Sequence, residues 1–440
     1  MPPIERRQTS YELDQVLLES ERLPNPIELK RVVVDLDIFE HIDKPYLTAQ
    51  MVVADQTNFY ETAGIITGEK ITITLISSKG DIAIPITKIF RVVKTAIKYA
   101  SDESQLIIFE LIEEIGFLSN IFNVNRHYTG KIGSILNKIS KQYLEKEVDF
   151  ESNEKQKVNI IVPNMDPIEA LNWLKDRATT SEGFPFYLHS TLVGEKLFFR
   201  DLGTMLSAPV INPNEIFKND KASANSPSVK MIINHEFENY DTIFRQIGMG
   251  IVGASYRYID TTQENIQTFS FDIRKDLYDV LIAKGVMQGQ DNPDFSELYK
   301  INGKSFNKIK SRNITMVGGT NAQRNITTAE YDLGYSEAKT AAGYKQQIIA
   351  KAMDNVLKRA SLTIIVPGIN FIDGDKHLTI GNNIAIEFAK STADRDRAVE
   401  QIDTRRSGNY MILSARHMFK REQYDISLGC VKLGNLRSND

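Results

Sequence analysis

The sequence predicts a mixed, mainly β fold in which two antiparallel β units flank an α+β region. Three observations support this class. From residue 362 to 430, short runs of alternating apolar and polar residues are separated by Gly and Asp turns, as in small barrels and sandwiches. Residues 29–112 show the same alternation, although no residue-by-residue repeat is assigned between the two units. Between them the apolar spacing changes from that of strands to that of helices.

The composition bounds the classes of function. The chain has 440 residues, which is room for two to four domains, and its 42% hydrophobic and 25% charged residues are ordinary for a globular protein. A formal net charge of −4 argues against a general nucleic-acid binder. The single cysteine, Cys430, excludes an intrachain disulfide and a cysteine-based metal cluster. We expect no signal peptide, no membrane span, and synthesis and assembly in a cytoplasm.

The first domain is predicted to be a β-barrel over residues 1–116. Residues 1–27 are polar and contain proline, so we expect an irregular lead-in there. No helix is expected inside this unit. Strands are predicted at 29–38, 48–55, 68–75, 82–86, 89–97 and 105–112.

Residues 117–228 are predicted to form an α+β middle domain. Apolar residues recur at helical spacing over 131–144, which indicates an amphipathic helix. A second helix is expected to begin at Asp166, a suitable N-cap, with Pro167 in the first helical position. A hairpin is expected over 184–200, and a polar connector follows it.

The remaining residues are predicted to complete a second barrel around inserted material. Residues 229–284 are expected to supply strands shared between that barrel and the middle domain, with a short helix at 241–247. Residues 285–345 are rich in Gly, Asn, Ser and Lys and are predicted to be an insertion or long loop. A helix over 328–359 leads into the last domain, 346–440, which holds the second barrel.

No catalytic, cofactor or metal site is predicted. The six histidines include no pair three to five residues apart, so the sequence contains no local zinc pair. Residues 248–253 match the G-x-G-x-x-G spacing, with Asp272 beyond them. They lack the preceding strand and following helix of a dinucleotide loop, so turn or packing glycines are the preferred interpretation.

Charged residues are also interpreted as structural. Glu113 and Glu114 lie at a strand end, and Asp373 and Asp375 flank a turn glycine, although carboxylate pairs can serve a glycosidase. The basic residues between 304 and 312 are interpreted as a solvated loop.

The order of several motifs resembles the baseplate central hub proteins of contractile-tailed bacteriophages, which are tail-tube-like and carry the central spike. The first unit contributes IDKPYL at 42–47, VVAD at 52–55 and GEKI at 68–71, and NRHYTG at 125–130 leads into the middle domain. The last unit contributes VPG at 366–368, IDG at 372–374, SGNYMI at 407–412, RHMF at 416–419 and YDISL at 424–428. The residues taken as the structural signature are Asp55, Gly68, Gly130, Gly368, Gly374, Gly408, His417 and Tyr424.

The resemblance implies two tail-tube-like antiparallel β-barrel domains and an α/β middle region. It implies a homotrimer whose six barrels match a sixfold tail tube on one side and a threefold spike on the other. The implied partners are tail tube or tube-initiator proteins, a central spike protein with or without a lysozyme, and phage DNA that crosses the channel without specific binding. The implied place is the tail baseplate of the virion, assembled in the bacterial host cytoplasm, with no enzymatic activity and no cofactor.

Two other functions stay open. The chain could be the hub part of a spike complex in a contractile secretion or injection machine, which would use the same fold. It could instead be a cell-wall glycosidase that uses a carboxylate such as Glu113 or Glu236.

Overall fold

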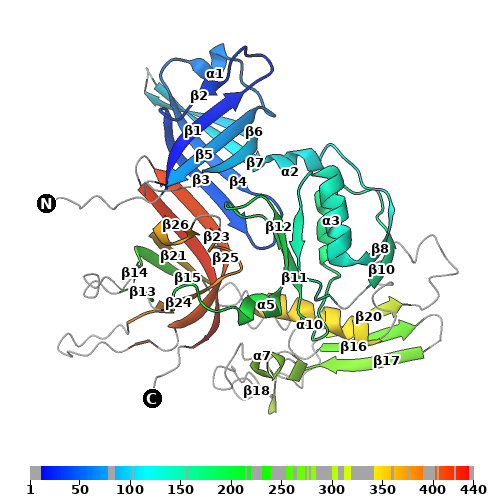
Figure 1. Cartoon of the computed structure of the whole chain (residues 1–440). Helices are drawn as coiled ribbons and strands as arrows, with labels where there is room; N and C mark the ends of the chain where they lie inside the picture. Colours follow the sequence, from blue (N-terminus) through cyan, green and yellow to red (C-terminus); the bar gives the residue numbers. More distant parts are fainter. Residues whose placement is uncertain are drawn as a thin grey trace, which may run out of the picture.

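In a computed structural model the chain is mainly antiparallel β sheet with few helices, which confirms the predicted fold class (Figure 1). Two β units lie next to each other, and the helical middle region lies beside them at the right of Figure 1. The structure describes residues 11–77, 85–101, 104–154, 157–213, 216–219, 230–238, 254–260, 265–272, 275–276, 279–283, 300–305, 312–318, 341–357, 361–373, 376–389, 402–403, 406–420 and 423–435.

The first β unit is a rolled sheet with the strand order β3-β4-β7-β6-β5-β1-β2. The prediction of an irregular lead-in is wrong for β1, which pairs antiparallel with β5 and buries Val16 and Leu18 completely. A register shift between Leu13 and Gln15 breaks the alternation of this strand, so its apolar residues do not follow a single period of two. A one-turn helix, α1, was not expected either. The elements are β1 (Tyr11–Glu19), β2 (Ile27–Glu28), β3 (Val33–His41), β4 (Thr48–Asp55), α1 (Phe59–Thr62), β5 (Lys70–Ser77), β6 (Ile86–Ser101) and β7 (Ser104–Glu113).

The middle region consists of two short sheets covered by helices. Both predicted helices are confirmed as α3 and α4, and Asp166 caps α4 by accepting a 2.8 Å hydrogen bond from the Glu169 amide. The predicted hairpin is confirmed as the β11–β12 pair. The elements are α2 (Glu114–Ser119), β8 (His127–Lys131), α3 (Ile132–Tyr143), β9 (Val148–Phe150), β10 (Lys157–Ile161), α4 (Pro167–Lys175), β11 (Phe186–His189), β12 (Leu197–Asp201) and α5 (Leu202–Ser207).

The second β unit closes on itself around its own apolar core. The sheet runs β15-β21-β26-β25-β24-β13-β14, and the Ile233 amide, just after β14, donates a 2.7 Å hydrogen bond to the Ile365 carbonyl of β21. The elements are β13 (Phe217–Lys218), β14 (Lys230–Met231), β15 (Asn234–Glu238), β21 (Ser361–Pro367), the 3-10 helix η5 (Gly368–Asn370), β22 (Ile372–Asp373), β23 (Lys376–His377), β24 (Asn383–Glu387), β25 (Gly408–Lys420) and β26 (Gln423–Asn435).

The chain between β15 and β21 forms separate structure. β16 pairs antiparallel with β17 and parallel with β20, and the helix expected over 328–359 is observed as α10. The helix predicted at 241–247 and the glycine motif at 248–253 lie outside the described residues. The elements are β16 (Ala254–Asp260), β17 (Asn265–Phe271), α7 (Asp279–Ala283), β18 (Lys300–Ile301), β19 (Lys304–Ser305), β20 (Arg312–Gly318) and α10 (Ala341–Leu357).

The two β units repeat one strand order. The spatial order in the first unit is β3-β4-β7-β6-β5, and the spatial order in the second is β15-β21-β26-β25-β24. Along the chain, the strands at equivalent places follow one another in the same order in both units. The two units also agree residue by residue. The amide of Gly68 donates a hydrogen bond to the Val92 carbonyl, and the amide of Gly381 donates the equivalent bond to the Ile412 carbonyl. A register shift follows both Val92 and Ile412. The structure therefore shows a residue-level repeat that was not assigned from the sequence.

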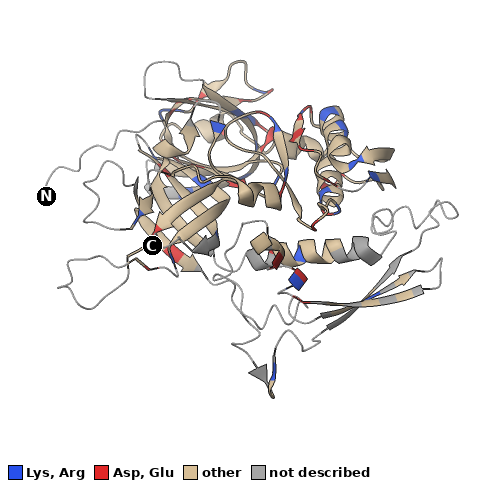
Figure 2. Ribbon diagram, turned by 60° about the horizontal axis from the view of Figure 1, so that its bottom comes forward, with Lys and Arg blue, Asp and Glu red and all other residues tan. Residues whose placement is uncertain are grey.

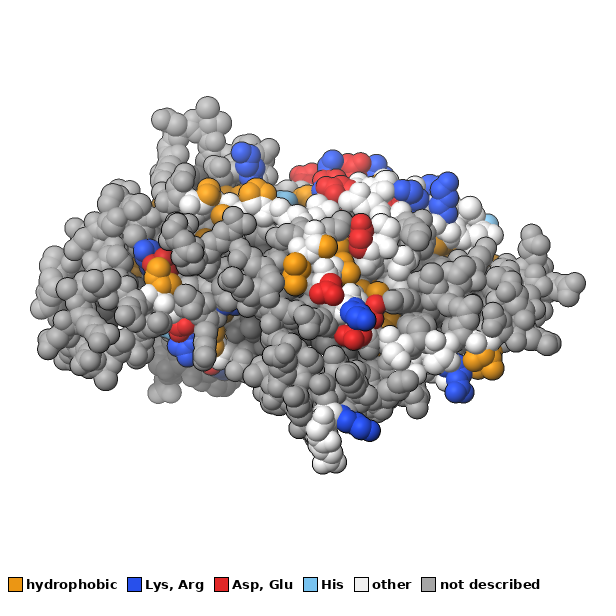
Figure 3. Space-filling model, turned by 90° about the horizontal axis from the view of Figure 1, so that it is seen from below, with side chains coloured by type: hydrophobic (Ala, Val, Ile, Leu, Met, Phe, Trp, Pro, Cys, Tyr) orange, Lys and Arg blue, Asp and Glu red, His pale blue; other side chains and the backbone are white. Residues whose placement is uncertain are grey.

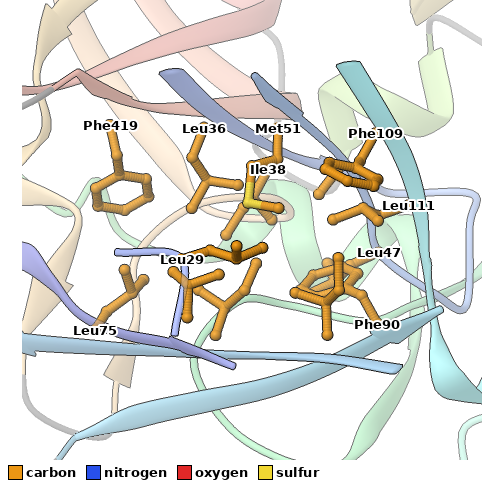
Figure 4. Close-up of a cluster of buried hydrophobic side chains, with 14 of the residues drawn as sticks. Leu29, Leu36, Ile38, Leu47, Met51, Leu75, Phe90, Phe109, Leu111 and Phe419 are labelled. Carbon is orange, nitrogen blue, oxygen red and sulfur yellow. The ribbon is translucent and has the colours of Figure 1, made fainter. Parts of the chain in front are cut away.

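The core of the first β unit includes side chains from the second. Leu36, Ile38 and Met51 are fully buried in this core, which Figure 4 shows. Phe419 of β25 enters it from the neighbouring unit and is stacked on Tyr424, with the ring centroids 4.6 Å apart. The two β units are therefore packed together as well as hydrogen-bonded.

Candidate functional site

Eight neighbouring strands form one continuous sheet across the two β units. Their order is β15-β21-β26-β25-β3-β4-β7-β6, and the joint between the units is the antiparallel pairing of β25 with β3. In this joint Ser414 faces His41 at one end and Phe419 faces Leu36 at the other. β25 can reach β3 because its first half pairs with β24 while its second half extends beyond that strand. A sheet edge in one unit is thus covered by a strand of the other.

Ion pairs lie along the face of this sheet that points away from the first core. Across the joint, Arg416 lies 2.6 Å from Asp37 and Lys420 lies 3.3 Å from Asp35. On the neighbouring strands of the same face, Lys94 lies 3.1 Å from Glu110. Charges of opposite sign therefore neutralise one another on this face.

The same mixing of charges is seen over the wider surface. Acidic and basic residues are distributed over both β units in the ribbon (Figure 2). Seen from below, red and blue side chains stand next to one another among the described residues (Figure 3).

A buried polar cluster lies at the joint between the units. Nε2 of His417 lies 3.3 Å from Oε1 of Glu40, and both side chains are almost fully buried. Nδ1 of His417 is 2.8 Å from the hydroxyl oxygen of Tyr424, and the Leu192 amide donates to Glu40. Burial acts to raise the pKa of the Glu40 carboxyl, but the attraction of His417 and the hydrogen bonds to the carboxylate outweigh it and lower that pKa.

A second buried cluster joins the first β unit to the middle region. Nζ of Lys146 donates a 2.6 Å hydrogen bond to Oε1 of Glu113, and the Ser190 hydroxyl lies within hydrogen-bond distance of both side chains. The Leu47 amide donates to the other carboxylate oxygen at 2.8 Å. A cleft of about 250 Å³ opens beside this cluster, and Lys88 is among its lining residues.

The surroundings of Glu113, Glu114 and Glu236 show whether these carboxylates could serve a glycosidase as an acid and base pair. Burial acts to raise the pKa of Glu113, but Lys146 and Lys88 lower it below its ordinary value. A general acid needs a raised pKa, so Glu113 is poorly suited to that role. Glu114 is occupied in a 2.6 Å ion pair with Arg91, and Glu236 lies on β15, far along the sheet from both. The structure therefore does not bring these carboxylates together as an acid and base pair.

Two of the signature residues shape turns in the first unit, and a third lies within a strand of the middle region. Asp55 accepts hydrogen bonds from the amides of Thr57, Phe59 and Tyr60 at 3.0 to 3.1 Å, so it ends β4 and holds the start of α1. Gly68 has a φ of +94°, which a residue with a side chain rarely adopts. Gly130 lies within β8.

Three further signature residues meet at the joint. A Cβ atom on Gly368 would lie only 2.2 Å from Cε1 of Tyr424, so the backbone passes directly against the ring. The hydroxyl of that ring is the one that bonds to His417. Gly408 is the first residue of β25, and Gly374 lies outside the described residues. The structure thus brings Gly368, His417 and Tyr424 into one cluster and leaves the other signature residues apart.

Important partners in both clusters were not identified from the sequence. Glu40, Lys146 and Ser190 lie far along the chain from the residues they contact. The buried alternation of β3 was the available signal for Glu40, because a carboxylate on the apolar side of a strand requires a partner.

Neither a metal-binding group nor a membrane-spanning helix is found in the described part of the chain. No group of three or more His, Cys, Asp or Glu there is arranged to hold a metal ion. No helix in the described ranges is long and apolar enough to cross a membrane. Of the basic cluster, Lys304 lies on β19 and Arg312 on β20, whereas Lys308 and Lys310 lie outside the described residues.

Comparison with known proteins shows similarity in structure. No protein-family model matches the chain, and no curated protein matches it in sequence. A tail protein from Neisseria meningitidis MC58 is similar in structure, with a TM-score of 0.52 and 12% identity over 96% of this chain and 97% of that one. A 43 kDa tail protein of prophage MuSo2 from Shewanella oneidensis gives 0.49 and 12% identity over 95% and 98%. The fold of the chain is therefore that of the Neisseria tail protein.

Proposed function

We propose that the chain is the structural hub of a contractile phage tail baseplate. Three copies form a ring that joins a sixfold tail tube to a threefold central spike. The fold shared with a tail protein along nearly the whole of both chains supports this placement.

The observation that carries the proposal is the repeat of one strand order in two β units that lie next to each other in one sheet. Three such chains supply six units of one kind. A ring of six similar units can face a sixfold tube, and its true threefold symmetry can face a threefold spike. The chain therefore has the internal symmetry that such a connection requires.

The charge distribution fits a passage for DNA. The ion pairs on the continuous sheet neutralise Asp35, Asp37 and Glu110 with basic partners. We place this face toward the channel, because a wall of compensated charge does not hold a passing polyanion. Tail tube or tube-initiator proteins and the spike protein are the proposed partners, in the baseplate of the virion, after assembly in the host cytoplasm.

The hub is proposed to have no reaction of its own. The low pKa of Glu113 and its buried ion pair with Lys146 support a structural role for the most suggestive carboxylate. Purified chain added to cell-wall peptidoglycan is expected to release no soluble fragments. Release that Glu113→Gln or Glu236→Gln abolishes would establish a glycosidase and contradict the proposal.

The mass of the purified chain tests the ring. Light scattering after size-exclusion chromatography is expected to give three times the 49.9 kDa of one chain. A mass of one chain at every concentration would contradict the hub. Co-purification with the tube and spike proteins encoded beside it identifies a phage baseplate, whereas a partner from a secretion machine would move the same ring to that system.

A further inference from the structure

An exposed apolar pair is held outward on the loop between α2 and β8. Ile121 is 58% exposed and Phe122 is 42% exposed, although hydrogen bonds fix the loop on both sides of them. The Ile121 amide donates a 3.0 Å hydrogen bond to the Leu118 carbonyl, and the buried Val124 forms an antiparallel bridge with Met165. The backbone therefore holds both side chains in solvent, and burial against a partner would be favourable.

Phe122 lies beside basic residues at the C-terminal end of α3. The centroid of its ring is 6.2 Å from that of Tyr143, at an interplanar angle of 55°. Nη1 of Arg126 donates a 3.4 Å hydrogen bond to Oε1 of Gln142, the residue before Tyr143. Lys138 lies one helical turn earlier, so its side chain is on the same side of α3 as that of Gln142. The apolar pair is thus bordered by two exposed cations.

The positive charge of this surface has no local counterpart. Residues 115–144 contain four basic residues and no Asp or Glu. No described residue forms an ion pair with Arg126 or Lys138. Glu145, which follows this segment, lines the cleft beside Lys146. A partner that brings carboxylates to Arg126 and Lys138 would therefore supply the missing charge.

We propose that the patch formed by Ile121, Phe122, Arg126 and Lys138 docks an acidic segment of a partner protein in which apolar side chains are flanked by carboxylates. The apolar side chains of that segment cover Ile121 and Phe122, and its carboxylates pair with the two cations at the border. Protein interfaces have this arrangement, with a central apolar contact surrounded by groups of complementary charge. The docking does not depend on the number of copies of the chain that assemble. The four residues are called the α3-end patch below.

Other anionic partners fit the α3-end patch less well. Duplex DNA would pair its phosphates with Arg126 and Lys138, but its backbone offers Ile121 and Phe122 no apolar surface. A bilayer offers both kinds of group, but even one myristoyl chain holds a protein to a membrane only marginally. The side chains of Ile121 and Phe122 together contain fewer carbon atoms than such a chain. A protein segment supplies both groups, and it can approach α3 and β8 from the side away from both β units (Figure 1).

Binding of a synthetic peptide to the full chain tests the docking. The probe is a fluorescein-labelled peptide of sequence Glu-Asp-Leu-Phe-Asp-Glu, and its fluorescence anisotropy is measured as the chain is added. Saturable binding that weakens at raised salt is expected, because the border contacts are ion pairs at an exposed surface. The matched peptide Gln-Asn-Leu-Phe-Asn-Gln keeps the shape and removes the charge, so its affinity should be about ten-fold lower or less.

Charge reversal in the chain locates the binding surface. The variant with Arg126→Glu and Lys138→Glu is expected to bind the acidic peptide about ten-fold more weakly and to gain affinity for the basic peptide Lys-Arg-Leu-Phe-Arg-Lys. Phe122→Ala is expected to weaken the acidic peptide without changing its salt dependence. The variant with Arg31→Glu and Lys44→Glu makes the same charge change at exposed positions of the first β unit and is the matched control. An unchanged midpoint of urea unfolding shows that each variant is folded.

The outcomes separate this inference from the proposed function. Absence of binding by the natural chain, or equal affinity of the natural and reversed chains for the acidic peptide, overturns the inference. Tighter binding of duplex DNA or of phosphatidylserine vesicles, lost in the reversed chain, also overturns it and assigns the patch to that partner. Loss of the trimer in the reversed chain makes the patch a contact between copies, which overturns the inference and leaves the hub intact. A monomeric chain that binds the acidic peptide at this patch upholds the inference and contradicts the hub.

Discussion

Replacing Phe419 by alanine should destabilise the first β unit, although this residue belongs to a strand of the second. The Phe419 ring is 5% exposed, lies in the core of the first unit and is stacked on Tyr424 with an interplanar angle of 3°. The substitution leaves the pairing of β25 with β3 in place, so it tests the packing across the joint separately from the hydrogen bonds.

The size of the effect follows from burial. Removal of a buried phenylalanine ring costs about 3–5 kcal/mol, from the lost transfer free energy and the cavity that remains. The stacking on Tyr424 contributes about 0.5–1.5 kcal/mol of that total. Phe122 is 42% exposed, so Phe122→Ala is expected to change stability by less than about 0.5 kcal/mol and is the matched control.

Amide hydrogen exchange is the suitable assay, because it reports the opening free energy of each strand separately in a chain of several units. Phe419→Ala is expected to lower the opening free energy of β3 and β4 by at least 2 kcal/mol, while α3 keeps its protection. Unchanged exchange in β3 and β4, or a loss no greater than in Phe122→Ala, would refute the packing of the two units described here.

Two further predictions concern residues at the joints. Gly368→Ala places a methyl group against the buried Tyr424 ring and should lower the free energy of unfolding by about 1–3 kcal/mol. An unchanged midpoint of urea unfolding would contradict the close approach of the Gly368 backbone to that ring. Burial lowers the pKa of Lys88 to about 8, whereas in the unfolded chain its pKa is about 10.4. The unfolded state therefore binds more protons between these pH values, so stability should rise from pH 8 to 10 in the natural chain and not in Lys88→Met. Parallel stability curves would contradict this assignment.

The β units could be predicted because their strands alternate strictly. The pattern of Leu36 and Ile38 in β3, or of Ile426 and Leu428 in β26, places every second side chain in a core. The alternation of β1 is harder to recognise, because a register shift between Leu13 and Gln15 breaks its period of two. Local pattern is thus sufficient where the alternation is unbroken, and it is weaker where a bulge shifts it.

The joints depend on contacts between distant parts of the chain. Glu40 contacts His417 only because β25 extends past β24 and pairs with β3. The alternation of apolar residues within either strand does not predict which strand it pairs with. The repeat was hidden for a related reason. Residues 239–360 separate β15 from β21, whereas six residues separate their counterparts β3 and β4. Gly68 and Gly381 share a positive φ and a hydrogen-bond pattern, which become comparable only in three dimensions.

Images of the purified assembly by electron microscopy test the central claim most directly. We predict a closed ring of three chains with six β units around one channel. Particles of one chain, or an open assembly without threefold symmetry, would contradict the account.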